Sequence, residues 1–95
     1  MTGKQKSYLR GLAHDLRPIF QIGKDGVNDN MITDIRSYLN KHELVKVSVL
    51  QNCPEEMDEI EETFTDCGFN VIQVIGKTLV LYLKSKNAKN PIILP

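Results

Sequence analysis

The sequence predicts a single α/β domain in which three helices and four strands follow one another in the order α-β-α-β-α-β-β. Apolar residues recur at helical spacing in three stretches, and the stretches between them are rich in β-branched and apolar residues. The last two β-rich segments are separated by only two residues, as in a hairpin. Because strands that alternate with helices form right-handed crossovers, we expect a mixed four-stranded sheet with helices packed on its apolar side. The 95 residues, 41% of them hydrophobic, suffice for one core and not for two.

The first helix is predicted over residues 3–15. Thr2 and Gln5 have the spacing of a capping box, in which two side chains satisfy each other's backbone N–H groups. An apolar stripe follows at helical spacing, formed by Leu9, Leu12, Ala13 and Leu16. Pro18 disfavours helical backbone at the residue before it, so the helix should end there and residues 18–22 should form a short strand.

The second helix is predicted to follow Asn28 or Asp29, either of which can cap its first turn, and to end at about Lys41. Its apolar stripe is formed by Met31, Ile32, Ile35, Tyr38 and Leu39. Residues 44–50 then alternate between valines on one face and Lys46 and Ser48 on the other. Such alternation is typical of a strand with one face in water.

A third helix is expected to begin at Pro54, because proline is favoured at the first helical position. Its apolar face comprises Met57, Ile60, Phe64 and Cys67. Gly68 is well placed to cap its C-terminal end.

The closing hairpin is predicted to join residues 69–75 to residues 78–84 through Gly76-Lys77, whose leading glycine favours a type II′ turn. One face of the sheet should be more polar and should carry Lys46, Ser48, Gln73, Tyr82 and Lys84. The position of the first helix relative to this face stays open. Residues 85–95 are basic and lack periodicity, so we expect a domain over residues 1–84 followed by a tail.

The formal net charge of zero conceals a segregation of charge along the chain. Residues 55–66 carry seven acidic side chains and no basic one, and the 12 basic residues elsewhere stand against only five acidic ones. We expect the acidic run to be the solvated outer face of the third helix. The basic remainder is compatible with a polyanionic partner, because affinity for phosphate follows the local field.

The motif Gly23-Lys24-Asp25-Gly26 lies between a predicted strand and a predicted helix. Glycine permits positive φ and lets a phosphate approach the backbone, while the following helix offers free N–H groups and the positive end of its dipole. Lys24 would add a mobile charge, as in the Gly-x-x-Gly loop of KH modules. The alternative is a tight turn with an exposed lysine, and the negative charge of Asp25 counts against phosphate.

A second basic feature lies on the first helix. At 100° per residue Lys6, Arg10 and His14 form a ridge beside the apolar stripe. The alternative is a face that only keeps the protein soluble. His14 is expected to be a partly exposed histidine, since no carboxylate or second histidine is arranged around it.

Motifs for catalysis, cofactors and metals are absent from the sequence. The glycine patterns that bind nucleoside triphosphates or dinucleotides do not occur, nor does a nucleophile turn, and the carboxylates lack a partner that would raise a pKa. Cys53 and Cys67 form no Cys-x-x-Cys pair, so neither a disulfide nor a metal site is expected. We therefore predict no catalytic residue and no cofactor. The chain also lacks the apolar stretch of a signal peptide or membrane span, which favours a cytoplasmic protein that does not bind membranes.

Five segments together resemble the YhbY family of single CRM-domain proteins (chloroplast RNA splicing and ribosome maturation). They cover about residues 2 to 84 in collinear order and are Thr2-Gly-Lys-Gln-Lys, Tyr8-Leu-Arg-Gly-Leu-Ala-His14, Gln21-Ile-Gly-Lys-Asp-Gly-Val27, Lys41-His-Glu-Leu-Val-Lys-Val47 and Gln73-Val-Ile-Gly-Lys-Thr-Leu-Val-Leu-Tyr82. The resemblance implies a fold similar to the C-terminal domain of translation initiation factor 3. It also implies RNA binding and association with precursors of the large ribosomal subunit.

Matching positions imply an RNA-facing surface. The loop residues would be Gly23, Lys24, Asp25 and Gly26, and the surrounding basic residues would be Lys6, Arg10, Lys46 and Lys77. The family usually ends its last strand in Tyr-Arg, whereas this chain has Tyr82-Leu83-Lys84. This chain therefore offers no forked guanidinium at that position, although Lys84 supplies a point charge one residue later.

The expected function is therefore that of a monomeric, non-enzymatic RNA-binding protein of large-subunit assembly, which holds ribosomal RNA through its phosphates. Sequence specificity should be low, because aromatic residues make up only 6% of the chain. The alternative is an adapter that docks its acidic helix on a ribosomal protein. Salt-sensitive binding to protein-free RNA would separate the two.

Overall fold

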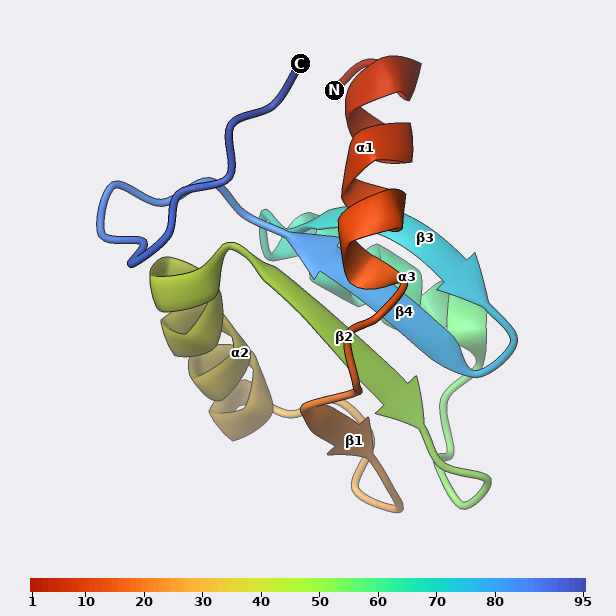
Figure 1. The fold of residues 1–95 in the computed structure, drawn as a ribbon. Coiled ribbons are helices and arrows are strands. Elements are labelled where there is room, and N and C mark those ends of the chain that lie inside the picture. The colour runs from red at the N-terminus through yellow and green to blue at the C-terminus, as the bar shows by residue number, and fades with distance from the viewer.

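The computed structural model describes all 95 residues and confirms the predicted order of elements (Figure 1). The elements are α1 (Gly3–Ala13), β1 (Phe20–Ile22), α2 (Asp29–His42), β2 (Leu44–Val49), α3 (Met57–Asp66), β3 (Asn70–Ile75) and β4 (Thr78–Tyr82).

The four strands form one mixed sheet in the order β1-β2-β4-β3. β1 is parallel to β2, whereas β4 is antiparallel to both β2 and β3. Gly76 has a φ of 56° and Lys77 has no positive φ, as a type II′ turn requires. Ile22 pairs with Val49, and Thr78 pairs with Ser48. The end of β1, the end of β2 and the start of β4 therefore lie at the same end of the sheet.

The larger hydrophobic core lies on the face of the sheet that α2 and α3 cover. It comprises Ile22, Ile35, Leu39, Val45, Val47, Val49, Ile60, Phe64, Phe69, Leu79 and Leu81. The alternation predicted for β2 and β4 is thus confirmed, because the valines of one strand and the leucines of the other share this core.

α1 packs on the opposite face of the sheet, which Figure 1 shows in front of β4 and β3. A smaller core is buried there, formed by Leu9, Ala13, Leu44, Ile72, Val80 and Tyr82. Tyr82 lies on the face that was predicted to be more polar, yet only 3% of it is exposed. The face is polar over part of its area only, and α1 covers the apolar part.

Both predicted N-terminal caps are present. The backbone N–H of Gln5 donates to Thr2 Oγ1 at 3.1 Å, and the N–H of Thr2 donates to Gln5 Oε1 at 3.1 Å. Asn28 caps α2, because its Oδ1 accepts from the N–H of Met31 at 2.9 Å. α1 ends at Ala13, two residues before the predicted end.

The start of α3 differs from the prediction. Pro54 does not begin the helix, which starts at Met57 with Glu56 as its N-cap. The N–H of Glu56 donates to Glu59 Oε1 at 3.2 Å, so a side chain from within the helix satisfies the N-terminal donor and fixes the start. Pro54 belongs to the preceding turn.

The end of α3 follows the prediction for Gly68, which has a φ of 92°. Its N–H donates to the carbonyl of Thr65 at 3.0 Å, and the N–H of Phe69 donates to the carbonyl of Phe64 at 3.1 Å. These two bonds define a Schellman motif. The rings of Phe64 and Phe69 lie 6.0 Å apart and bring the apolar contact of that motif into the larger core.

Glu43 is a buried charged residue that the sequence analysis did not single out. It ends α2 in the left-handed region with a φ of 65°, and only 2% of it is exposed. Its two carboxylate oxygens accept from the N–H groups of Ser85 and Ile92, both at 2.8 Å. Such charge-assisted bonds offset the burial of a carboxylate. Glu43 thus ties residues 85–92 to the end of α2.

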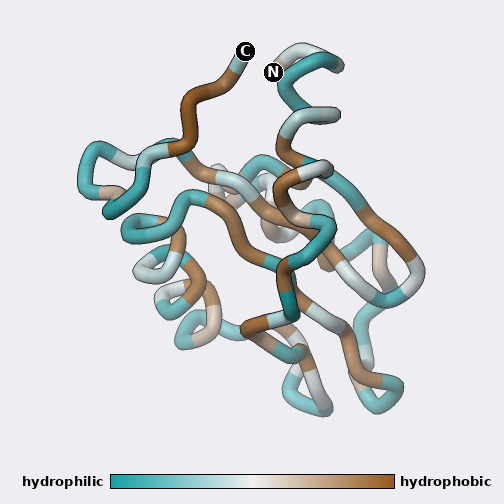
Figure 2. The backbone as a smooth tube through the Cα atoms, viewed as in Figure 1, coloured by the Kyte–Doolittle hydropathy of each residue, from teal (hydrophilic) through white to brown (hydrophobic).

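Residues 85–95 contain no helix or strand, but they contact the rest of the protein. The N–H of Lys89 donates to the carbonyl of Lys41 at 3.0 Å, and Ile92 and Leu94 pack against the smaller core. Figure 2 shows this apolar end of the chain beside α1, where the side chain of Gln5 donates to the carbonyl of Pro95.

Candidate nucleic-acid interface

Three connecting segments gather at the end of the sheet where β1 and β2 finish and β4 begins. We call this region the loop end; it comprises residues 23–26, 50–56 and 76–77. The N–H of Leu50 donates to the carbonyl of Ile22 at 2.9 Å, and the N–H of Val49 donates to the carbonyl of Lys77 at 2.7 Å. The end of β2 therefore holds the Gly23–Gly26 loop on one side and the hairpin turn on the other.

The Gly23–Gly26 loop lies between a strand and a helix, as predicted. The N–H of Gly26 donates to the carbonyl of Gly23 at 3.0 Å, which closes a tight turn with Lys24 and Asp25 exposed at its tip. Gly26 has a φ of 63°, whereas Gly23 has no positive φ. Only the second glycine of the motif therefore uses the left-handed region that glycine favours. A Cβ there would make ordinary contacts at 3.7 Å with the side chains of Asn52 and Leu50.

Gly26 is buried against a carboxylate that the prediction placed elsewhere. A Cβ on Gly26 would overlap the carboxylate of Glu55, whose Oε1 accepts from the N–H of Val27 at 2.6 Å. The six other acidic residues of the run are exposed, as expected for the outer face of α3. The expectation is wrong for Glu55 because this residue precedes the helix and helical periodicity does not govern it. Its partner is 28 residues away, so no local pattern indicates the contact.

The tip of the loop retains two backbone donors. The N–H groups of Lys24 and Asp25 have no hydrogen-bond acceptor within the protein, whereas those of Gly26 and Val27 are both bonded. An anion at this loop would therefore meet the free N–H groups and the ammonium of Lys24 first.

The ridge predicted on α1 is solvent-exposed. Lys6, Arg10 and His14 are all exposed, while Leu9 and Ala13 of the same helix are buried. Figure 1 places the start of α1 far from the loop between β1 and α2. The ridge and the Gly23–Gly26 loop are therefore two separate parts of the surface.

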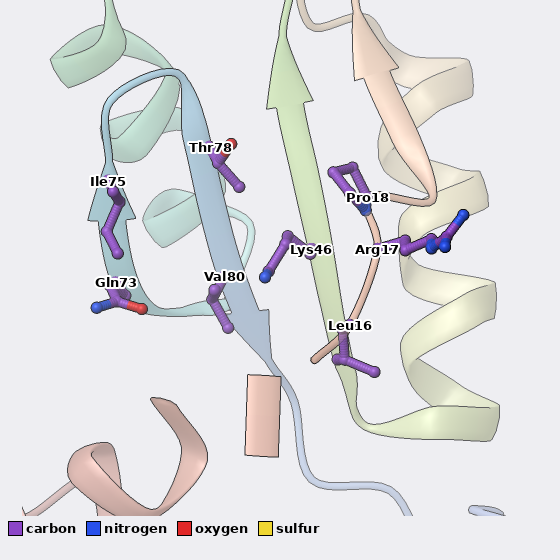
Figure 3. A pocket seen from close by; sticks show the side chains of 8 residues that line it. All are labelled: Leu16, Arg17, Pro18, Lys46, Gln73, Ile75, Thr78 and Val80. Atoms are coloured by element: carbon purple, nitrogen blue, oxygen red, sulfur yellow. The ribbon is translucent and has the colours of Figure 1, made fainter. Parts of the chain in front are cut away.

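A groove of about 340 Å³ occupies the uncovered part of the polar sheet face (Figure 3). It is lined by Leu16, Arg17, Pro18, Lys46, Gln73, Ile75, Thr78 and Val80. None of these residues is acidic. Lys46 is half-buried and extends across the sheet toward β4, whereas the guanidinium of Arg17 points away from the groove. Lys46 pairs with Val80 in the middle of β4, and Lys77 lies in the hairpin turn just before β4 begins.

Lys84 does not join this surface. β4 ends at Tyr82, and the N–H of Leu83 donates to the carbonyl of Glu43 at 2.9 Å, which directs the chain toward α2. Lys84 consequently lines a different groove, together with Arg36 and Asn40 of α2. The expectation that Lys84 continues the polar face of β4 was wrong, because the strand ends two residues earlier than predicted.

Tyr82 has a hydroxyl whose pKa is shifted by its surroundings. Burial raises the pKa of its hydroxyl above the ordinary value of 10.0, and the nearby carboxylate of Glu43 raises the pKa further. Tyr82 belongs to the smaller core and not to the loop end.

The structure contains no group of three or more His, Cys, Asp or Glu side chains that could hold a metal ion. Cys53 and Cys67 are half-buried free thiols. None of the helices has the length and apolar character to span a bilayer.

Comparison with known proteins gives consistent matches over nearly the whole chain. The model of the CRS1 / YhbY (CRM) domain matches residues 1–82. The probable RNA-binding protein YqeI of Bacillus subtilis is 52% identical over 90 residues, which are 94% of this chain and 94% of YqeI. An RNA-binding protein of Haemophilus influenzae is 37% identical over 90 residues, which are 94% of this chain and 91% of that protein.

A solved structure shares the fold. The solution structure of SAV1595 from Staphylococcus aureus has a TM-score of 0.81 and 49% sequence identity, and the match covers 100% of this chain and 99% of that one. These matches confirm the resemblance found in the sequence. The chain belongs to the CRS1/YhbY (CRM) domain family.

Proposed function

We propose that this protein is a non-enzymatic RNA-binding protein of large ribosomal subunit assembly, and that it holds ribosomal RNA by its phosphates at the loop end. Membership of the CRM domain family supports RNA as the partner, as do the names of the relatives. The role in ribosome assembly rests on what the family resemblance implies.

One observation carries the placement of the RNA. The Gly23–Gly26 loop and the Gly76-Lys77 turn lie at the same end of the sheet, and each presents an exposed lysine. The free N–H groups at the tip of the first loop add neutral donors beside Lys24. Lysines and backbone N–H groups are the donors that proteins use for phosphate oxygens.

Low sequence specificity follows from the aromatic residues. Among the Phe and Tyr side chains, Tyr8 is the one that is solvent-exposed, at 44%. Phe64, Phe69 and Tyr82 lie in the cores. Because unpaired bases are usually read by stacking on exposed rings, the protein should recognise the path of the backbone more than the bases.

The test compares two double variants. Lys24→Ala with Lys77→Ala removes the charges of the loop end, and the control Lys41→Ala with Lys89→Ala removes two exposed charges from the end of α2 and the C-terminal segment. Affinity for a short single-stranded RNA is measured by fluorescence anisotropy at several salt concentrations. We expect the first variant to bind more weakly and its log-log salt slope to fall by about 1.4, close to two single-strand phosphate contacts. A first variant that binds like the control would refute the placement.

The role in assembly is tested by sequencing the RNA that is crosslinked to the protein in cells. We expect precursor sequences of the large-subunit RNA to be enriched, and loss of this enrichment in the loop-end variant. A random distribution over cellular RNA would refute the ribosomal part of the proposal.

One observation favours the adapter as a second candidate. Six acidic side chains are exposed on and just before α3, which gives the protein a strongly negative face. If neutralising this face abolishes association with ribosomal particles while affinity for protein-free RNA is kept, the adapter function is supported instead.

A further inference from the structure

A backbone N–H at the end of the Gly23–Gly26 loop is already bonded to a carboxylate of the protein itself. Glu55 Oε1 accepts from the N–H of Val27 at 2.6 Å, a short distance for an N–H donor and one that fits a charge-assisted hydrogen bond to a carboxylate. The carboxylate also lies against the Cα of Gly26, where any larger residue would collide with it. Within residues 55–66, Glu55 is the one acidic residue that is not exposed.

A carboxylate and a phosphate can both accept a hydrogen bond from the N–H of Val27. Both carry negative charge on oxygen acceptors, and both are stabilised by N–H groups near the start of a helix. Val27 immediately precedes the N-cap of α2, Asn28. The N–H of Val27 would be available to a phosphate at this loop, but it is already bonded to the carboxylate of Glu55.

We propose that Glu55 competes with RNA phosphate for the N–H of Val27 and thereby lowers the affinity of the loop for RNA. This inference rests on the proposed function, because it concerns the same loop. In the free protein the carboxylate occupies the inner donor, and only the N–H groups of Lys24 and Asp25 are open. A bound phosphate displaces the carboxylate into solvent and takes over the N–H of Val27.

The side chain of Glu55 is held in a way that permits this exchange. Its carboxylate has one hydrogen bond, and its neighbour Gly26 offers no side chain to trap it. It is only half-buried, so a displaced carboxylate can reach water. Loss of a hydrogen bond to a charged group of this kind corresponds to about a tenfold change in an equilibrium constant.

The test uses Glu55→Ala, which removes the competitor, and Glu55→Gln, which keeps an acceptor and removes the charge. Asp58→Asn is the matched control, because Asp58 is exposed and lies three residues away on α3. The probe is a twelve-residue oligouridine, measured at several salt concentrations on protein shown to be folded by amide NMR. We expect about tenfold tighter binding by Glu55→Ala, an intermediate gain by Glu55→Gln, and a control close to wild type.

Two further readouts separate competition from a general change of charge. The log-log salt slope of Glu55→Ala should stay equal to that of the wild type, because the bound phosphate meets the same N–H group in both proteins, whereas a gain that comes only from reduced repulsion shrinks as salt screens it. The Val27 amide resonance should move on addition of RNA in every chain that binds. Equal affinity gains in Glu55→Gln and Asp58→Asn, with no further gain in Glu55→Ala, would reduce the effect to charge and overturn the proposal.

Failure of this inference differs from failure of the proposed function. If Lys24→Ala weakens RNA binding but a folded Glu55→Ala binds no better than wild type, Glu55 does not compete and the inference alone is wrong. If Lys24→Ala leaves RNA affinity unchanged, the loop does not bind RNA and both statements fail.

Discussion

The contact between Gly26 and Glu55 predicts a strong coupling between two substitutions. Gly26→Ala places a Cβ at a φ of 63°, which costs about 1 to 2 kcal/mol in the left-handed region. The same Cβ displaces the Glu55 carboxylate and breaks its bond to Val27. We assign that part-buried bond about 1 to 2 kcal/mol, so Gly26→Ala alone should cost about 2 to 4 kcal/mol.

The double variant distinguishes the two contributions. In a Glu55→Ala background the collision partner is absent, so adding Gly26→Ala should cost only the backbone strain of about 1 to 2 kcal/mol. The free energy of unfolding is measured by urea denaturation of the wild type, both single variants and the double variant. Gly76→Ala is the matched control, because Gly76 has a φ of 56° and a Cβ there meets nothing within 4 Å. It should be additive with Glu55→Ala.

The outcome decides why the second glycine of the motif is needed. If Gly26→Ala and Glu55→Ala are additive within about 0.5 kcal/mol, the carboxylate does not constrain Gly26 and the packing argument fails. A coupling of about 1 to 2 kcal/mol would mean that the glycine serves an internal contact even in the absence of RNA.

Three further predictions concern the rest of the molecule. Glu43→Gln should lower the free energy of unfolding by about 1 to 3 kcal/mol, because the amide can accept from only one of the two N–H groups and leaves the other buried without a partner. If stability is unchanged and the Ser85 amide is still protected from exchange, Glu43 does not hold residues 85–92 in place. The pKa of Tyr82 is higher in the folded protein than in the unfolded chain, so the hydroxyl loses its proton more readily after unfolding. The stability that the neutral hydroxyl contributes is therefore complete below pH 10 and is lost as the pH rises through the pKa of the folded state. Tyr82→Phe should therefore flatten the fall of the melting temperature above pH 10, and equal slopes in both proteins would count against the burial effect. Neutralising Glu61 and Glu62, both exposed on α3, should change stability by less than about 0.5 kcal/mol and leave oligouridine affinity equal or slightly higher; weaker binding to protein-free RNA would place the acidic face in contact with RNA.

The sequence predicted those parts of the fold that depend on local periodicity and capping. Thr2 with Gln5, Asn28 and Gly68 mark helix ends through contacts that span only a few residues, so their pattern is visible in the chain. Pro54 misled the prediction, because a favourable residue for the first turn does not oblige the helix to begin there. The hydrogen bond from the Glu56 N–H to the Glu59 side chain marks the start instead.

The contacts that the sequence did not predict join distant residues. Glu55 meets Val27 across 28 residues, and Glu43 meets Ser85 and Ile92 across 42 and 49 residues. In each contact a buried or half-buried carboxylate accepts hydrogen bonds, although nothing in the neighbouring sequence of Glu43 or Glu55 indicates burial. The candidate interface was predicted residue by residue, but its division into a loop end and a separate α1 ridge depends on the sheet order and could not be predicted from periodicity.

The burial of β4 on both faces has a consequence for folding. Leu79 and Leu81 enter one core while Val80 and Tyr82 enter the other, so a slip of one residue would exchange apolar side chains for apolar side chains. In a strand with one face in water, the hydrophobic pattern fixes the register. In β4 this pattern distinguishes the correct register only poorly from one shifted by a residue. The register must be set elsewhere, by the two-residue Gly76-Lys77 turn and by the irregularity between Val71 and Gln73 in β3. The turn that exposes Lys77 is thus also the element that selects which face of β4 meets which core.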